Sequence, residues 1–248
     1  MAKVLVICPT FDHADTLFAS IGSVRAQSFT DWEMAVILDG APPRTSLVMN
    51  AIAGCDDRIH VYRHPKSERY GEAYRDPVIR GSNAEFICHL GDDDIFLHDH
   101  LSNLVEQLAQ AEWVNQAPLR LNPHLQEWLP ANYGTGPMRR AMVEGKQITV
   151  GINYVAYRRD AYLRLPEGWS CAPWDAGASD VFMWSKFFND KDLTVASSAV
   201  TSSLKFPSRI PTRQHRMPED RLAEITPWLA RAAAPGLAQR LRLSLIHI

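Results

Sequence analysis

The chain has 248 residues, of which 46% are hydrophobic and 22% charged, and its formal net charge is -2. This composition is typical of a globular protein with one large α/β domain or two small ones. The near-neutral charge gives no reason to expect a nucleic-acid partner or a charge-driven membrane contact. No apolar run approaches the length of a membrane span, so we expect no integral membrane segment. The first residues run into a predicted strand rather than a signal peptide.

The first half of the chain alternates between strand and helix patterns. Four runs of apolar and β-branched residues predict strands, at residues 3–8, 33–38, 58–62 and 85–90. Helical spacing follows each run, first at Leu17, Ile21 and Val24 after a cap by Asp12, then at residues 46–53, 71–80 and 98–111. These alternations predict an α/β fold built on a mostly parallel, doubly wound sheet with helices on both faces.

The pattern changes after Trp113. Residues 115–145 are rich in Pro, Gly and Asn and predict an irregular excursion or a small hairpin. Further strands are expected at residues 147–157 and 193–196. Helices are expected at residues 158–163, at residues 179–188 and from Glu219 onward, with a break at Pro235-Gly236. A proline-punctuated loop at residues 206–217 carries Arg209, Arg213 and His215.

The four cysteines are scattered and form no CxxC pair: they are Cys8, Cys55, Cys88 and Cys171. Cys8 and Cys88 lie at the ends of apolar runs, where we expect small core residues. Unpaired thiols of this kind predict a reduced protein, and we therefore expect a cytoplasmic location.

Three adjacent carboxylates, Asp92, Asp93 and Asp94, follow the fourth predicted strand. Because like charges repel, such a cluster is most easily kept ionised by a cation among its oxygens. The alternative is a solvated turn followed by a helix cap, a role that Asp94 could fill. Thr10 and Asp39 end the first two strands, so Thr10, Asp39 and Asp93 should share the sheet edge where open α/β sheets bind ligands.

The loop after the first strand has neither a GxGxxG pattern nor a Walker motif. Dinucleotide-type phosphate binding at a helix N-terminus is therefore not expected. A metal at the aspartate cluster would neutralise phosphates instead, and oxygen-only ligands favour Mg²⁺ or Mn²⁺ over Zn²⁺. The carboxylate on the second strand suits recognition of base N–H groups or ribose hydroxyls.

Several segments, in a fixed order, carry a resemblance to a known family. They are residues 4–12 (VLVICPTFD), residues 23–29 (SVRAQSF), Leu38-Asp39-Gly40 and Leu90-Gly91-Asp92-Asp93-Asp94. Together they resemble a family 2 glycosyltransferase with the GT-A fold. The resemblance covers residues 3–110 and extends more loosely to Phe188. It implies one GT-A domain with a nucleotide-sugar-binding half at residues 1–115, an acceptor-binding and catalytic half at 116–218, and a C-terminal helical segment at 219–248.

The resemblance implies a metal-dependent, inverting transfer of a sugar from a UDP- or GDP-sugar donor to a hydroxyl of a glycan or small-molecule acceptor. In such enzymes Thr10 and Phe11 would line the base pocket, and Asp39 would accept hydrogen bonds from the base. Asp92 would approach the ribose or a metal-bound water. Asp93 would bind Mn²⁺ or Mg²⁺, which would stabilise the diphosphate as a leaving group.

The resemblance also assigns roles outside the strand ends. Arg75 would lie near the diphosphate, and Asp180 matches the general base that takes a proton from the acceptor. His215 would contact the metal or, with Arg209 and Arg213, the phosphates. Two tryptophans would stack on the acceptor, Trp169 and Trp174. Each role has a structural alternative. Arg75 could be a helix-face charge, and Asp180 a helix N-terminal carboxylate. His215 could be a solvated loop histidine, and the tryptophans could pack a loop onto the core.

Three positions depart from the family pattern. Gly91 stands where many members have the first Asp of the DxD motif, Asp76 replaces an Asn, and Ser179 replaces a Glu. These departures motivate an alternative, a nucleotide-sugar-binding module with impaired catalysis. A nucleotidyltransferase is a third hypothesis, which we disfavour because the first loop lacks a Gly- and Lys/Arg-rich phosphate grip.

Overall fold

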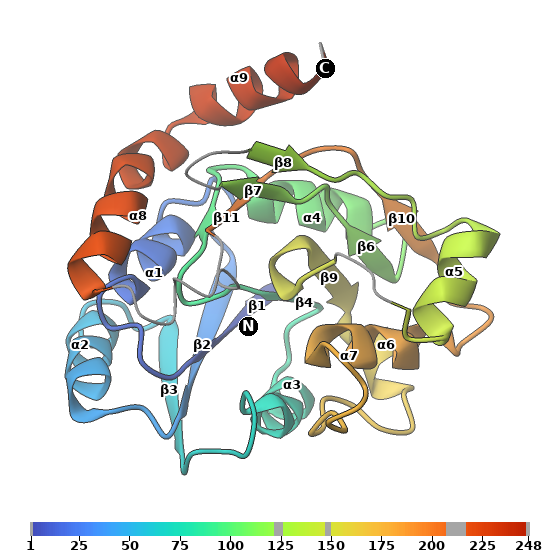
Figure 1. Ribbon diagram of the computed structural model, residues 1–248, viewed down its shortest axis with the longest axis horizontal. Coiled ribbons are helices and arrows are strands. Elements are labelled where there is room, and N and C mark those ends of the chain that lie inside the picture. The colour runs from blue at the N-terminus through green and yellow to red at the C-terminus, as the bar shows by residue number, and fades with distance from the viewer. Residues whose placement is uncertain (1, 122–125, 147–149, 207–216, 247–248) are drawn as a thin grey trace.

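A central sheet organises the molecule (Figure 1). The computed structural model describes residues 2–121, 126–146, 150–206 and 217–246. The sheet strands are β1 (Val4–Thr10), β2 (Trp32–Asp39), β3 (Ile59–His64), β4 (Phe86–His89), β6 (Trp113–Asn115), β9 (Val155–Arg158) and β10 (Val195–Ser197). Over the described residues they form a seven-stranded sheet in the order β10-β6-β9-β4-β1-β2-β3. Strands β3, β2, β1 and β4 are parallel, whereas β9 is antiparallel to both β4 and β6.

Strand β1 lies inside the sheet and shows why its sequence is apolar throughout. Val4, Val6 and Cys8 enter the hydrophobic core on one face of the sheet. Leu5 and Ile7 enter a separate core on the opposite face. A strand covered on both faces has no polar side to alternate with, so it appears in the sequence as a continuous apolar run.

Helices cover both faces of the sheet (Figure 1). One core includes residues of α1 (Leu17–Arg25), α2 (Pro43–Ala53) and α4 (His100–Leu108). The other includes residues of α3 (Arg75–Gly81), α5 (Gly136–Val143), α6 (Arg159–Leu163) and α7 (Ser179–Phe188). A 3-10 turn, η1 (Glu72–Tyr74), leads into α3. The predicted α/β architecture, mostly parallel and doubly wound, is confirmed.

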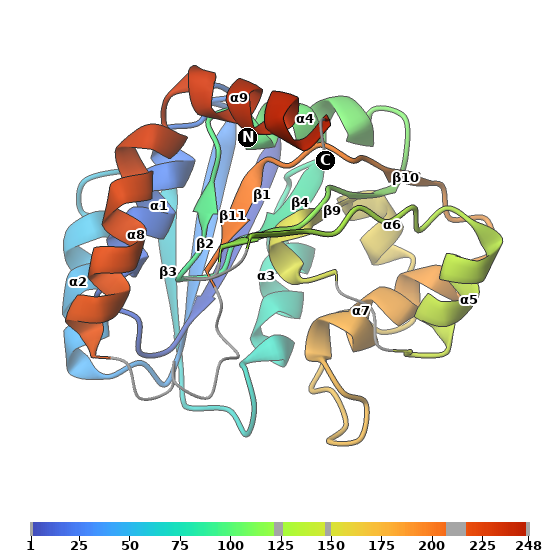
Figure 2. The same ribbon diagram turned by 45° about the horizontal axis from the view of Figure 1, so that its top comes forward.

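A smaller sheet and the C-terminal helices form a third core. The strands are β5 (Ile95–Phe96), β7 (Leu119–Leu121), β8 (Gln126–Trp128) and β11 (Ser203–Lys205), in the order β5-β11-β7-β8 within the described residues. Apolar side chains of these strands pack with α8 (Pro218–Ala232) and α9 (Pro235–Ile246). Figure 2 shows α8 running beside α1. Among the helices that the structure describes, none is both long and apolar enough to cross a bilayer.

Several predicted boundaries are wrong. The first helix begins at Leu17 after Thr16, and Asp12 does not cap it. Of the strand predicted at residues 147–157, the structure shows a 3-10 turn, η2 (Ile152–Tyr154), followed by β9. Strands β5, β6 and β11 were not predicted, because two or three residues are too few to show a period. Helix α5 was also missed, since the Pro- and Gly-rich sequence around it is typical of a loop.

Candidate functional site

The residues predicted at the sheet edge do lie together. Thr10 ends β1, Asp39 ends β2, and the acidic turn follows β4; β1 pairs directly with both β2 and β4. Thr10, Asp39 and Asp93 are all buried. The carboxyl ends of three adjacent parallel strands therefore bring an acidic, buried cluster to one edge, the position at which open α/β sheets bind ligands.

Asp39 is enclosed by the loop that follows β3, residues 65–71. Its Oδ1 accepts a hydrogen bond from Ser67 N at 2.6 Å, and its Oδ2 accepts from Ser67 Oγ at 2.9 Å and from Lys66 Nζ at 2.6 Å. Gly71 has φ of +65°, and a Cβ added there would lie 3.0 Å from the Asp39 side chain, so glycine permits this close approach. A carboxylate offers about four lone-pair sites, which leaves room for an N–H donor of a ligand.

Two residues beside Asp39 are available for a planar or hydroxyl-bearing ligand. Phe11 is 45% exposed, and Lys66 Nζ lies 5.2 Å from the centre of its ring. Thr10 Oγ1 is buried and has no hydrogen-bond partner among the described residues. Sequence reasoning missed Lys66 and Ser67, whose only signal was a polar loop directly after the third strand.

Asp92 is held by the loop between β1 and α1. His13 Nδ1 lies 2.8 Å from Asp92 Oδ1, and Thr16 Oγ1 donates to the Asp92 carbonyl at 2.9 Å. Burial lowers the pKa of His13, but the charge of Asp92, its hydrogen bond and the charge of Asp93 outweigh this and raise the pKa to about 9. At neutral pH the pair is therefore an ion pair, which the sequence pattern did not reveal.

Asp94 is a structural anchor and not the helix cap that the sequence allowed. It is fully buried, and its carboxylate accepts hydrogen bonds from Asn153 Nδ2, from Lys205 Nζ at 2.9 Å and from Phe206 N at 2.8 Å. Burial raises the pKa of Asp94, and the Lys205 charge opposes the shift. Asp94 thereby ties the acidic turn to η2 and β11.

The same anchor explains Gly91. Gly91 N donates to Asn153 Oδ1 at 2.7 Å, and a Cβ added at Gly91 would lie 2.7 Å from Asp94 Oδ2. A side chain at this position would displace the carboxylate that holds β11. The packing of this turn therefore requires glycine at position 91, where the family pattern has the first Asp.

The described residues fit a divalent cation that takes one carboxylate from the protein and most of its other ligands from phosphate oxygens and water. Asp93 brings a buried carboxylate to the edge, but no group of three or more His, Cys, Asp or Glu side chains with metal-binding geometry occurs in the described part of the chain. Mg²⁺ and related hard cations commonly take one or two carboxylates, with phosphate oxygens and water completing the shell. His215, Arg209 and Arg213 lie outside the described residues.

Arg75 is a buried cation with few partners. Its Nη2 is 3.4 Å from the Tyr70 carbonyl, while Nε and Nη1 have no hydrogen-bond acceptor among the described residues. Burial lowers the pKa of Arg75, and the charges of Glu72, Asp180 and Asp39 act against that shift. A buried guanidinium in this state has unused donors for an anionic ligand.

Trp169 packs against Arg75. The Arg75 guanidinium lies 4.3 Å from the centre of the Trp169 ring, and Trp169 Nε1 donates to Tyr157 Oη at 3.1 Å. Trp169 is only 2% exposed, so the prediction that it stacks on an acceptor is wrong. Trp174 is 75% exposed, and such a role requires an exposed ring.

Asp180 lies in the first turn of α7 and is partly buried. Its Oδ1 accepts a hydrogen bond from Val181 N at 3.1 Å. Burial raises the pKa of Asp180, against the effects of backbone N–H groups and of the Lys205 and Arg75 charges. A carboxylate with a raised pKa is a better proton acceptor than an exposed aspartate.

Asp76, which follows Arg75, makes its side-chain contacts with Tyr162 and Arg80. Tyr162 Oη donates to Asp76 Oδ1 at 2.6 Å, and Arg80 Nε lies 3.0 and 2.9 Å from its two oxygens. The carboxylate therefore joins α3 to α6. The difference from the usual Asn therefore falls on a residue that makes this contact.

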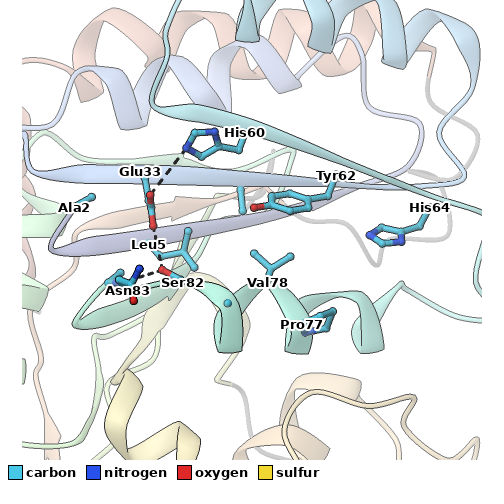
Figure 3. A pocket seen from close by; sticks show the side chains of 13 residues that line it. Ala2, Leu5, Glu33, His60, Tyr62, His64, Pro77, Val78, Ser82 and Asn83 are labelled. Atoms are coloured by element: carbon cyan, nitrogen blue, oxygen red, sulfur yellow. Dashed lines mark hydrogen bonds and ion pairs between the residues drawn. The ribbon is translucent and has the colours of Figure 1, made fainter.

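A separate hollow of about 530 Å³ lies between β3 and α3 (Figure 3). His60, Tyr62 and His64 of β3 face it in a row, with Glu33 of β2 at one end and Val78 of α3 opposite. None of the residues predicted for the site lines this hollow. It follows the face of the sheet, whereas the candidate site lies at the strand ends.

Comparison with known proteins places the chain in a family. A family model described as glycosyl transferase family 2 matches residues 5–164. Over 107 residues the chain is 30% identical to GalNAc(5)-diNAcBac-PP-undecaprenol beta-1,3-glucosyltransferase of Campylobacter jejuni, covering 43% of this chain and 35% of that protein. The chain thus spans about a third of that relative.

Two solved structures share the fold at low sequence identity. S. aureus TarS 1-349 in complex with UDP has a TM-score of 0.65 at 14% identity, covering 90% of this chain and 70% of that chain. Mannosyltransferase PcManGT from Pyrobaculum calidifontis, in complex with GDP-Man and Mn2+, has a TM-score of 0.61 at 17% identity, covering 98% and 75%. These neighbours have the GT-A architecture. Because the family model spans more than half of the residues, from β1 to the C-terminal end of α6, the chain belongs to glycosyl transferase family 2.

Proposed function

We propose that this chain transfers a sugar from a nucleoside diphosphate sugar to an acceptor hydroxyl. The observation that carries the proposal is the position of Arg75, a buried cation with unused donors that is subject to the charges of Asp39 and Asp180. A diphosphate supplies the anionic oxygens that such a guanidinium lacks. Asp39 and Asp180 would then act on opposite ends of the same donor.

The donor nucleotide would bind along the strand ends. Phe11 would stack on the base, while Asp39 and the unpartnered Thr10 hydroxyl would hydrogen-bond to it. Asp92, fixed by His13, would accept a ribose hydroxyl. The neighbour TarS was solved with UDP and the Pyrobaculum enzyme with GDP-Man, which supports a nucleotide of the UDP or GDP class.

Asp93 is the residue that would hold Mn²⁺ or Mg²⁺, and the Mn²⁺ in the Pyrobaculum complex supports a metal of this kind. When bound beside the diphosphate, such an ion supplies Lewis-acid stabilisation of the leaving group. The described residues alone do not enclose a metal, so we expect metal and nucleotide to bind together rather than separately.

Asp180 would accept the proton of the acceptor hydroxyl as its oxygen attacks the anomeric carbon. Attack from the face opposite the diphosphate would invert the configuration of that carbon. Trp174 would offer its exposed ring to the acceptor sugar. The name of the Campylobacter relative supports an acceptor sugar carried on a lipid diphosphate.

The same proposal includes a division of the chain into a donor half, an acceptor half and a C-terminal helical segment. It also includes the cytoplasmic location.

An alternative is a nucleotide-sugar-binding module that has lost its chemistry. Gly91 favours it, because it contributes no carboxylate to the acidic turn. The two functions share donor binding and differ in turnover. Release of free nucleotide from a UDP- or GDP-sugar without an acceptor would be evidence of turnover and would argue against the binding module.

The donor site is tested by calorimetry with UDP and GDP, with and without Mn²⁺, on the wild type, Asp93→Ala and the exposed control Asp57→Ala. We expect one nucleotide to bind in a Mn²⁺-dependent way to the wild type and to the control. Asp93→Ala should lose the Mn²⁺-dependent part. Undiminished Mn²⁺-dependent binding by Asp93→Ala would exclude Asp93 as the ligand.

A further inference from the structure

Arg69 joins two loops that are more than 100 residues apart in the sequence. It belongs to the loop 65–71, and only 8% of its side chain is exposed. Its Nη1 donates to the carbonyls of Ala172 at 2.6 Å and Pro173 at 2.7 Å, and its Nη2 donates to that of Gly177 at 3.1 Å. One guanidinium thus holds the main chain of the loop 172–177 at three points.

At its near end, Arg69 is part of the loop that encloses Asp39. Lys66 Nζ donates to the Arg69 carbonyl at 2.8 Å and lies 2.6 Å from Asp39 Oδ2. The fully buried Glu72 has Oε1 3.9 Å from Arg69 Nε, and its Oε2 accepts from Tyr70 N at 3.0 Å. The position of the Arg69 side chain therefore depends on how the loop 65–71 closes on Asp39.

At its far end, Arg69 contacts the segment that leads to α7. The loop 172–177 ends at Gly177, which has φ of +73°, and Asp180 follows in the first turn of the helix. The exposed ring of Trp174 lies 5.0 Å from the Arg69 guanidinium, within the range of a cation–π contact. The segment that Arg69 fixes carries Trp174 and leads directly to Asp180.

We propose that Arg69 is a positioning residue that couples nucleotide binding at Asp39 to the order of the loop 172–177. The inference rests on the proposed function, because it requires a nucleotide at Asp39. A base N–H that bonds to Asp39 adds to, or replaces, the bonds from Lys66 and Ser67, and either event changes the restraint on the loop 65–71. The guanidinium fork passes that change to the loop 172–177 through its three carbonyl contacts.

Lysine cannot take over this role. A guanidinium presents its donors in a rigid planar fork, whereas an ammonium is a point charge on a flexible stem. Arg69→Lys keeps the charge near Glu72 but loses the geometry that spans Ala172, Pro173 and Gly177. Arg69→Gln removes both, so the pair of variants separates charge from geometry.

The experiment is hydrogen–deuterium exchange of the segment 172–178, with and without UDP and Mn²⁺, or GDP and Mn²⁺ if UDP does not bind. The matched control is Arg139→Gln. Arg139 also links distant segments through carbonyls, those of Leu193 at 3.1 Å and Asp190 at 3.3 Å, and it also lies over an aromatic ring, Phe188, at 5.4 Å. Circular dichroism and calorimetry establish that each variant folds and binds the nucleotide.

In the wild type and in Arg139→Gln, we expect the nucleotide to slow exchange of this segment by about fivefold or more, the lower end of typical coupling between sites. In Arg69→Lys and Arg69→Gln the nucleotide should still bind, and the slowing should be lost. An equal response in the Arg69 variants, or no response in a wild type that binds the nucleotide, would overturn the inference. Failure of the wild type to bind either nucleotide would instead contradict the proposed function itself.

Discussion

The candidate site has two parts, and they differ in how fully their charged side chains are paired. On the strand-end side, each of three aspartates already has a basic partner: Asp39 with Lys66, Asp92 with His13 and Asp94 with Lys205. In the part formed by α3 and α7, Arg75 keeps two nitrogens without an acceptor among the described residues, and the Asp180 carboxylate has a pKa raised by burial.

The difference indicates two kinds of task. Paired, hydrogen-bonded groups fix a shape before any ligand arrives, because their favourable contacts already exist in the free protein. Buried groups without full partners cost stability and are retained where a ligand or reaction supplies what is missing. Under the proposed function, the paired side would hold the nucleotide, while Arg75 and Asp180 would lie where charge changes during transfer.

Asp180→Asn should have the largest effect on activity. Loss of the proposed base should lower kcat for transfer by about 10²- to 10⁴-fold, the usual range for general acid–base catalysis. Nucleotide affinity should remain that of the wild type, which calorimetry can check. Retained turnover in this variant would remove Asp180 as the base.

The same variant should gain stability at neutral pH. Because burial raises the pKa of Asp180, its stabilising contribution is fully present below the unfolded-state pKa and is lost as pH rises through the folded-state pKa. Asn carries no charge to bury, so the advantage of the variant in melting temperature should grow as pH rises through that range. A difference in melting temperature that is absent or independent of pH would show that burial of the charged Asp180 carboxylate does not cost stability.

Arg75→Gln tests the buried guanidinium that has unused hydrogen-bond donors. Hydrogen bonds to a charged partner contribute about 1.5–3 kcal/mol each, so donor affinity should fall by about tenfold to a hundredfold. Calorimetry measures that affinity, and the melting temperature of the free protein shows whether the variant still folds. A lower melting temperature with unchanged donor affinity would make Arg75 a structural residue instead.

Gly91→Ala disturbs the paired side. Its Cβ would lie 2.7 Å from Asp94 Oδ2, and shifting that carboxylate should cost about 1–3 kcal/mol of stability, as overpacking usually does. Gly81→Ala is the matched control, because nothing lies within 4 Å of its added Cβ. Equal melting temperatures for the two variants would show that the Asp94 carboxylate can shift without a loss of stability.

Asp76→Asn should have the smallest effect. An Asn oxygen can still accept from Tyr162 Oη, and the exposed pair with Arg80 contributes only about 0.3–0.5 kcal/mol. Both donor affinity and melting temperature should stay close to those of the wild type. A large loss of donor affinity would mean that Asp76 acts on Arg75 after all.

The sheet edge could be predicted because it follows from local pattern. Apolar runs that end at Thr10, Asp39 and the acidic turn identify neighbouring parallel strands and their shared end. The pairings could not be predicted in the same way. His13 with Asp92 and Arg69 with the loop 172–177 join segments 79 or more residues apart, and no local spacing encodes such contacts.

The burial of the two tryptophans could not be predicted from local sequence either. Trp169 and Trp174 both occur in one loop, residues 166–177, only five positions apart. Trp169 is buried because Arg75 and Tyr157 pack against it, whereas Trp174 stays exposed beside Arg69. Only the three-dimensional packing separates a core residue from a candidate acceptor platform.

The most direct test of the central claim is a thermal-shift panel of nucleoside diphosphates and their sugars on the wild type, with and without Mn²⁺. A ligand that binds only the folded state stabilises it by mass action, by about 2.7 kcal/mol at a hundred times its Kd. We expect one nucleoside diphosphate and its sugars to raise the melting temperature, and to raise it more with Mn²⁺. A folded protein that none of these ligands stabilises would contradict the assignment of the strand-end edge as a nucleotide-sugar site.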